Sequence, residues 1–130
     1  MAIVRAVVID DEKNTTELMK DLLEMHNLQV LGIGYNGNHA LRLVATNKPD
    51  VVFLDVKMPE MDGIDALKEI KKNYPKTKVI MVTGEKSDEL KKLLEEIGAD
   101  AVIFKPFEMQ KLLQVFDMVK MYVTSSLRNQ

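Results

Sequence analysis

Val51-Val52-Phe53-Leu54 is an apolar run without alternation, and Asp55 follows it directly. A run of this kind, rich in β-branched residues, is typical of a strand buried on both faces of a parallel sheet. A further run, Leu28–Ile33, admits a glutamine and a glycine, so we expect it at an edge of the sheet. The other apolar runs of the same buried type are Ala6–Ile9, Val79–Val82 and Ala101–Phe104.

Amphipathic helical patterns fill the gaps between these runs. Apolar residues at three- and four-residue spacing predict a helix that Ser87 caps and Gly98 ends. Asp62 is expected to cap another helix. Asn14 and Glu17 have the spacing of a capping box at the start of the first helix in the chain. The remaining two helical patterns cover 40–45, closed by Lys48-Pro49, and about 108–122.

Strand and helix therefore alternate five times along the chain. This alternation predicts a doubly wound α/β sandwich with right-handed crossovers. We expect a single domain over residues 1–123 and a frayed C-terminal tail over 124–130.

Composition excludes several classes of function. The 130 residues include 18 Lys and Arg against 20 Asp and Glu, a net charge of -2 that argues against nucleic-acid binding by bulk electrostatics. The chain has no cysteine, which excludes disulfides, thiolate metal sites and cysteine catalysis. No apolar run approaches the ~20 residues of a membrane span, and no signal-peptide pattern is evident. We therefore expect a cytoplasmic protein with no membrane contact.

The residues that follow the strands are polar and complementary in charge. Asp10 and Asp11 follow the first run, Asp55 the third, Thr83 the fourth and Lys105 the fifth. Ligands of open α/β sheets bind beyond the carboxyl ends of the strands, so these groups should converge at one edge. Taken alone, each of these residues is most simply interpreted as part of a turn or as a helix cap. Their conjunction favours a functional site.

Clustered carboxylates cost free energy unless a cation offsets their charge. Mg²⁺ suits such a site, because it takes one or two carboxylates together with waters and phosphate oxygens. Carboxylates, Mg²⁺, a lysine and a hydroxyl are the groups used in phosphoryl transfer. No glycine-rich phosphate loop accompanies them, so a nucleotide is not implied.

Four short motifs complete this pattern: Asp55-Val56-Lys57-Met58-Pro59-Glu60-Met61-Asp62-Gly63, Asp10-Asp11, Thr83-Gly84 and Lys105-Pro106-Phe107. With these motifs the chain resembles the CheY-like receiver domains of two-component response regulators, over residues 4–122. The resemblance implies a flavodoxin-like (βα)5 fold whose five-stranded parallel sheet has the order 2-1-3-4-5.

The resemblance also implies a role for each acidic residue. Asp55 would be the phosphoacceptor, attacking the phosphohistidine of a sensor histidine kinase or phosphotransfer protein. Asp11 and Asp55 would bind Mg²⁺ together with the backbone carbonyl of Lys57. Asp10 would contribute through water.

The remaining motif residues would serve the phosphoryl group. Lys105 would neutralise its oxygens, Thr83 would hydrogen-bond to one of them, and Gly84 would leave room for it. Pro106 would follow a cis peptide bond. The chain would catalyse its own phosphorylation and dephosphorylation without being an enzyme that acts on a separate substrate.

One position departs from the family pattern. Receivers often carry an aromatic residue three positions before the site lysine, and here that position is Val102. Phe104 is expected to be ordinary core. Phosphorylation must then act on the region of the last two helices by a route other than an inward-turning ring.

The last helical pattern is apolar almost all round, and two of its sides have separate interpretations. Val115, Met118 and Tyr122 form either extra core or a surface for a downstream target or a homodimer. The side expected to pack on the sheet comprises Met109, Leu112, Leu113, Phe116 and Val119.

Three alternatives stay open. The first is a pseudo-receiver that acts as an interaction module without phosphorylation. The second is an Asp-nucleophile phosphohydrolase, but Lys57 stands where such enzymes carry their general acid. The third, a flavodoxin-like electron carrier, shares the fold but lacks aromatic residues placed for a flavin. If the natural chain ends at Gln130 we expect a stand-alone receiver, and a longer natural chain could carry a DNA-binding or enzymatic output.

Overall fold

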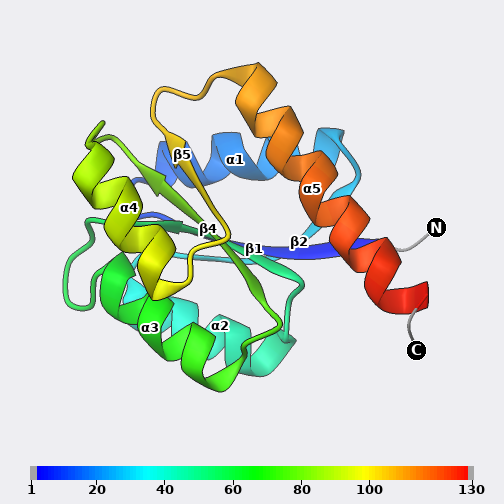
Figure 1. The fold of residues 1–130 in the computed structure, drawn as a ribbon, viewed down its shortest axis with the longest axis horizontal. Coiled ribbons are helices and arrows are strands. Elements are labelled where there is room, and N and C mark those ends of the chain that lie inside the picture. The colour runs from blue at the N-terminus through cyan, green and yellow to red at the C-terminus, as the bar shows by residue number, and fades with distance from the viewer. Residues whose placement is uncertain (1–2, 129–130) are drawn as a thin grey trace.

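A parallel five-stranded sheet forms the centre of the molecule, in the order β2-β1-β3-β4-β5 (Figure 1). The computed structural model describes residues 3–128. This order confirms the one expected from the resemblance, and it places the run with glutamine and glycine at an edge. The strands are β1 (Val4–Ile9), β2 (Leu28–Gly34), β3 (Val51–Asp55), β4 (Lys78–Thr83) and β5 (Ala101–Phe104).

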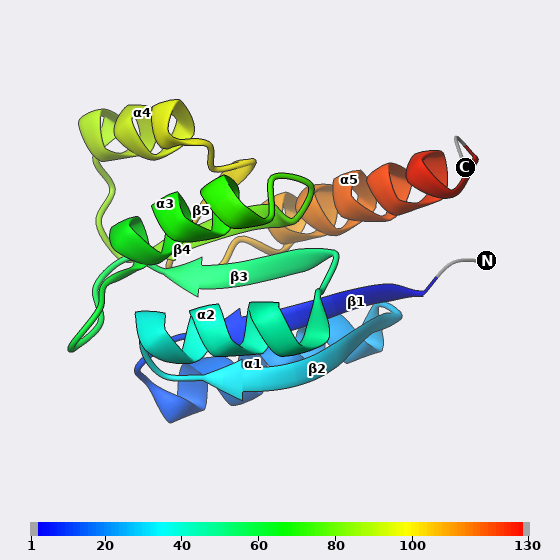
Figure 2. The ribbon, with the colours of Figure 1, turned by 90° about the horizontal axis from the view of Figure 1, so that it is seen from below.

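Helices cover both faces of the sheet (Figures 1 and 2). One face carries α1 (Lys13–Met25) and α5 (Met109–Arg128), and the other carries α2 (Gly37–Asn47), α3 (Gly63–Asn73) and α4 (Asp88–Ile97). Successive strand residues point to opposite faces and are buried on both. This is why the strands read as continuous apolar runs.

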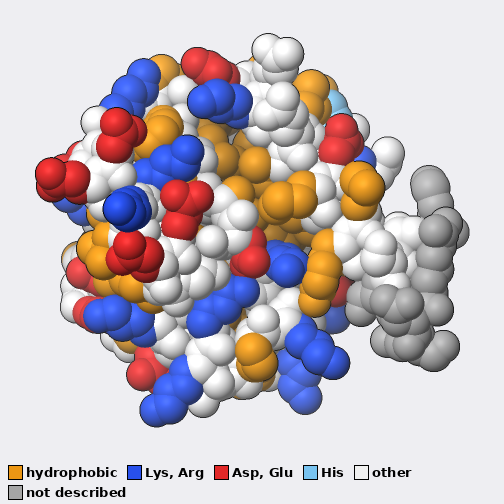
Figure 3. All heavy atoms as spheres, viewed as in Figure 1, with side chains coloured by type: hydrophobic (Ala, Val, Ile, Leu, Met, Phe, Trp, Pro, Cys, Tyr) orange, Lys and Arg blue, Asp and Glu red, His pale blue; other side chains and the backbone are white. Residues whose placement is uncertain are grey.

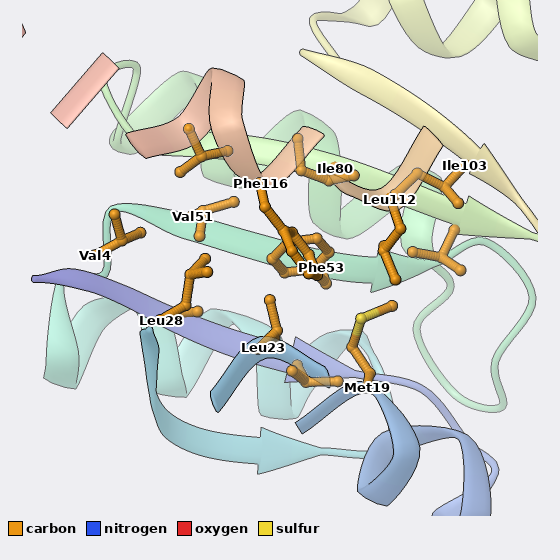
Figure 4. Packing of buried hydrophobic residues seen from close by; sticks show 14 of the residues in the cluster. Val4, Met19, Leu23, Leu28, Val51, Phe53, Ile80, Ile103, Leu112 and Phe116 are labelled. Atoms are coloured by element: carbon orange, nitrogen blue, oxygen red, sulfur yellow. The ribbon is translucent and has the colours of Figure 1, made fainter. Parts of the chain in front are cut away.

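The core between α1, α5 and the sheet is built around two aromatic rings (Figure 4). Phe53 of β3 and Phe116 of α5 meet almost perpendicular, with ring centroids 6.0 Å apart and an interplanar angle of 83°. Edge-to-face pairs of this kind add stability beyond the area they bury. Met19 and Leu23 of α1 are buried in the same cluster. The pair therefore joins the last helix to the centre of the sheet.

Most predicted helix ends are confirmed, and one is wrong. Ser87 Oγ accepts a hydrogen bond from Leu90 N at 3.1 Å, and Asp62 Oδ1 accepts one from Asp65 N at 3.0 Å. Gly98 ends α4 with a φ of 123°, a backbone conformation that favours glycine.

The capping box of Asn14 and Glu17 does not form. The helix begins earlier, at Lys13, with Glu12 at the N-cap position and no side-chain cap. Asp10 Oδ1 accepts a hydrogen bond from Glu12 N at 2.9 Å. This contact turns the chain directly after β1, so Asn14 already lies within the first helical turn.

The last helix is longer than predicted and buries a different stripe. It continues to Arg128, so residues 124–128 are helical rather than frayed, and 129–130 lie outside the described residues. The stripe that packs on the sheet is Leu112, Phe116, Val119 and Val123.

Met109 and Leu113, expected in the core, are instead 45% and 36% exposed. Val115 and Tyr122 are partly buried against the core, whereas Met118 is exposed. The predicted outward stripe of Val115, Met118 and Tyr122 is therefore not one free surface. A helix that is apolar almost all round does not reveal from its sequence which side meets the sheet.

None of the helices within residues 3–128 has the length and hydropathy of a membrane span.

Replacing Phe116 with alanine is expected to lower the free energy of unfolding by about 3–5 kcal/mol, because a buried aromatic ring is lost and a cavity remains. Urea denaturation followed by circular dichroism measures this. Met121→Ala on the same helix is the control, since Met121 is 70% exposed, and it should change stability by less than about 0.5 kcal/mol. Equal losses in both variants would contradict the packing described here.

Candidate functional site

Three carboxyl groups lie together beyond the carboxyl ends of β1 and β3. Asp10, Asp11 and Asp55 each offer an oxygen, and these oxygens lie within 4.8 Å of one another. They meet because β1 and β3 are neighbours in the sheet and both end at the same edge. Asp10 and Asp55 are buried, while Asp11 is exposed. The predicted convergence of the three acids is confirmed.

Lys105 brings positive charge to this cluster from the end of β5. Its Nζ lies 2.6 Å from Asp10 Oδ2 and 3.6 Å from Asp55 Oδ2. Its backbone N–H donates to Thr83 O at 2.8 Å, and the following bond to Pro106 is cis, as the resemblance implied. Among the described residues, Lys105 alone forms ion pairs with Asp10 and Asp55.

Burial and the neighbouring charges both shift pKa values at this site. Burial raises the pKa of Asp55 to about 6, with a further increase from the charge of Asp10, against the opposing effects of Lys105 and the Val56 N–H. Burial lowers the pKa of Lys105, but the hydrogen bond to Asp10 and the charge of Asp55 outweigh it, so that this pKa is raised. The Asp55 carboxyl therefore holds its proton more tightly than an exposed aspartate does.

This donor set suits a hard divalent cation. Carboxylate oxygens are the ligands that Mg²⁺ prefers, and Mg²⁺ keeps several of its waters when it binds only one or two of them. The two oxygens of Asp10 already accept hydrogen bonds from Glu12 N and Lys105 Nζ. The oxygens of Asp55 are engaged as well, since Oδ1 accepts a hydrogen bond from Val56 N and Oδ2 lies 3.6 Å from Lys105 Nζ. Asp10, Asp11 and Asp55 together could hold such a cation.

A cleft of about 290 Å³ opens beside the acidic cluster. Its lining includes Asp55, Thr83 and Gly84, and a Cβ atom added to Gly84 would meet only open space. Thr83 Oγ1 accepts a hydrogen bond from Glu85 N at 3.1 Å, which leaves the hydroxyl hydrogen available for a ligand. Lys57 and Glu85, at the rim, approach to 3.9 Å with both side chains exposed, so this pair contributes little stability. The cleft can admit a phosphoryl donor to Asp55.

The last strand departs from expectation at Phe104. This side chain is only partly buried and, with Lys86, Pro106 and Lys111, lines a surface cavity of about 200 Å³. It lies at the exposed edge of the sheet, where β5 has no further strand to cover it. Val102 packs against the core on the side of α2, α3 and α4.

Two contacts of the loop after Asp55 could not be foreseen from the sequence. Asn36 Nδ2 donates to Glu60 Oε2 at 3.1 Å, and Gly37 N donates to Met61 O at 2.7 Å. An asparagine before a helical pattern signals an N-cap. Nothing in the sequence signals a partner in another loop.

The comparisons with known proteins agree with this geometry. The chain matches the family model of the response regulator receiver domain over residues 6–117. It is 33% identical over 119 residues to the probable C4-dicarboxylate response regulator DctR of Bacillus subtilis, a match that covers 91% of this chain and 53% of that protein. The chain thus spans about half the length of this curated relative.

Similar solved structures include receiver and response regulator domains. The Francisella response regulator 1452 receiver domain is 30% identical with a TM-score of 0.84, covering 94% of this chain and 98% of that one. The response regulator domain of Thermotoga maritima CheB is 28% identical with a TM-score of 0.83, covering 95% and 98%. A chain of the CheX-CheY-BeF3-Mg²⁺ complex from Borrelia burgdorferi is 25% identical with a TM-score of 0.80, covering 95% and 89%.

The family match extends from β1 into α5, and the order of the strands and the acidic cluster at their carboxyl ends agree with it. This chain belongs to the response regulator receiver domain family.

Proposed function

We propose that this chain is a phosphorylatable receiver of a two-component or phosphorelay system, in which Asp55 accepts a phosphoryl group from a phosphohistidine. The observation that carries the proposal is the approach of Lys105 to Asp10 and Asp55, beside a cleft open to solvent. A sensor histidine kinase or a phosphotransfer protein would be the donor. The match to a probable response regulator supports this assignment.

The Asp55 carboxylate is held in a defined orientation. Its Oδ1 accepts a hydrogen bond from Val56 N at 2.9 Å, while its Oδ2 faces Lys105. In the transfer, an Asp55 oxygen forms a bond to phosphorus as the bond from phosphorus to the donor's imidazole nitrogen breaks. The imidazole leaves with the electron pair. Only the ionised carboxylate can attack, and with a pKa of about 6 it is ionised near neutral pH.

Mg²⁺ would be held by Asp11, Asp55 and the backbone carbonyl of Lys57, with Asp10 contributing through water. When bound, it neutralises charge on the phosphoryl oxygens and on the carboxylates. Lys105 would remain beside Asp55 and pair with a phosphoryl oxygen. Thr83, buried at the end of β4, would donate its hydroxyl hydrogen to another. These roles are those of a phosphoryl-transfer site, where positioning and charge neutralisation provide most of the catalysis.

We place the output of this switch on the face formed by α4, β5 and α5. Figure 3 looks onto this face and shows hydrophobic side chains exposed among charged ones. Leu93 of α4 and Met109, Leu113 and Met118 of α5 are exposed large hydrophobic residues. A downstream protein or a second copy of the chain would bind here. The receiver unit would span residues 1–123.

Incubation with Mg²⁺ and acetyl phosphate or phosphoramidate is expected to add a single phosphoryl group, seen by intact mass spectrometry. Asp55→Ala and metal-free samples should show no adduct, because they lack the nucleophile or the cation. A folded wild-type chain that accepts phosphate from neither small donor nor candidate kinases would instead be a pseudo-receiver.

Lys105→Ala is expected to slow this phosphorylation on the order of a hundredfold, because a positive charge that stabilises the transferring group is lost. The rate at which the phosphorylated mass appears measures the effect. Circular dichroism should show that the fold persists. Lys111→Ala removes an exposed lysine of α5 and serves as the control. A rate in Lys105→Ala equal to that of the control would contradict the role given to Lys105.

Asp55→Asn is expected to stabilise the metal-free protein above pH 6. The pKa of Asp55 is raised in the folded state, so the folded protein binds this proton more tightly than the unfolded chain, and its stability falls as pH rises from about 4 to 6. Asparagine avoids this loss, with a gain of up to about 3 kcal/mol at pH 7.5 that vanishes near pH 4.

Thermal unfolding in EDTA across this pH range measures the difference. Asp117→Asn, at an exposed carboxylate of α5, is the control and should change stability little at any pH. A gain that is independent of pH would show that the charge of Asp55 is not its source.

A further inference from the structure

The loop that joins β3 to α3, residues 56–62, carries Lys57 and is called here the acceptor loop. Its two ends are closed on each other, since Gly63 N donates to Val56 O at 2.8 Å. Gly63 permits this closure, because a Cβ there would collide with the carbonyl oxygen of Asp55. This closure lies at the base of the loop and leaves its tip, 58–61, to be held by other contacts.

The tip is held by the N-terminal end of α2. Gly37 N donates to Met61 O at 2.7 Å, and Asn36 Nδ2 donates to Glu60 Oε2 at 3.1 Å. A Cβ on Gly37 would lie 2.6 Å from both Cγ and O of Met61, so only glycine allows this approach. The N-cap residue and the first residue of α2 thus bind two adjacent residues of the acceptor loop.

Asn36 uses both ends of its amide. Its Oδ1 accepts a hydrogen bond from His39 N at 2.9 Å and caps α2, while its Nδ2 faces Glu60. The two partners together fix which end is oxygen and which is nitrogen. The Asn36 side chain is buried, with 8% of the residue exposed, whereas Glu60 is exposed, so the contact between them is partly shielded from competing water. The acceptor loop is thereby attached to the N-terminus of α2.

We infer that Asn36 and Gly37 are positioning residues of the metal site: they hold the acceptor loop so that the Lys57 carbonyl can join the aspartates in binding Mg²⁺. The inference rests on the proposed function, in which that carbonyl is a ligand. A side-chain ligand can adjust its rotamer, but a carbonyl ligand is placed only by its backbone. Residues that orient ligands from outside the coordination shell commonly alter metal affinity about 10–100-fold.

Asn36→Asp tests this inference while keeping the cap. Aspartate caps helices as well as asparagine, but it cannot donate to Glu60 and places a second carboxylate beside it. We expect Mg²⁺ to bind the unphosphorylated variant about tenfold more weakly than the wild type. Isothermal calorimetry with Mg²⁺ measures this affinity, and thermal unfolding in EDTA checks that the fold is retained.

The matched variants change Glu60. Glu60→Gln alone still accepts a hydrogen bond from Asn36 through its amide oxygen, so wild-type affinity is expected. Combined with Asn36→Asp, Glu60→Gln supplies an amide that donates to the new carboxylate, so the hydrogen bond returns with its direction reversed. Most of the lost affinity should return with it. A loss of helix capping would not be rescued in this way.

The phosphorylation rate provides a second readout. In Asn36→Asp the concentration of Mg²⁺ that gives half the maximal rate should rise about tenfold, with little change in the maximal rate. The inference is overturned if Asn36→Asp binds Mg²⁺ as the wild type does, or if the double variant shows no recovery. A wild-type chain that binds no Mg²⁺ would overturn the metal site of the proposed function and this inference with it. Because the wild type is measured first, this failure of the proposed metal site is distinguished from a failure of the inference about Asn36 and Gly37.

Discussion

Mutual repulsion among Asp10, Asp11 and Asp55 is the constraint around which the functional end of this molecule is arranged. Oxygens of the three side chains lie within 4.8 Å of one another, and two of these residues are buried. Burial is the largest cause of the raised pKa of Asp55; the charges of Asp10 and Asp11 raise this pKa further, and the charge of Lys105 lowers it. A metal cation bound by these three carboxylates would offset the repulsion among them.

The fold tolerates this cost because the stabilising contacts lie elsewhere. Strands buried on both faces and the ring pair of Phe53 and Phe116 build the cores, while the charged groups sit at the ends of strands and in loops. A rigid sheet sets the spacing of the strand ends, and the loops vary the chemistry between them. The parallel arrangement matters here, since it brings β1, β3, β4 and β5 to the same edge.

The proposed switch can act through the same edge. Thr83 and Lys105 end adjacent strands and share a backbone hydrogen bond of 2.8 Å. A phosphoryl group on Asp55 would attract the side chains of both Thr83 and Lys105. A change of charge at the end of β3 would therefore shift side chains at the ends of β4 and β5. Val102 has no ring to turn inward, and the exposed hydrophobic residues of α4 and α5 lie on the face that these strands support.

The sequence by itself determined the alternation of elements, the polar residue at each strand end, and the helix ends at Asp62 and Ser87. These features depend on neighbours a few residues apart, so periodicity and local hydrogen bonding predict them. Their likeness to a known family then supplied the order of the strands. The capping pattern mispredicted the first residue of α1, because the hydrogen bond from Glu12 N to the Asp10 side chain determines where this helix begins.

Only the tertiary structure decided which side of α5 is buried, and that Asn36 reaches Glu60 across 24 residues. The same holds for the 2.6 Å approach of Lys105 to Asp10, which are 95 residues apart in the chain. These contacts join segments that the sheet and its helices bring together, and their distances follow from packing rather than from any local pattern.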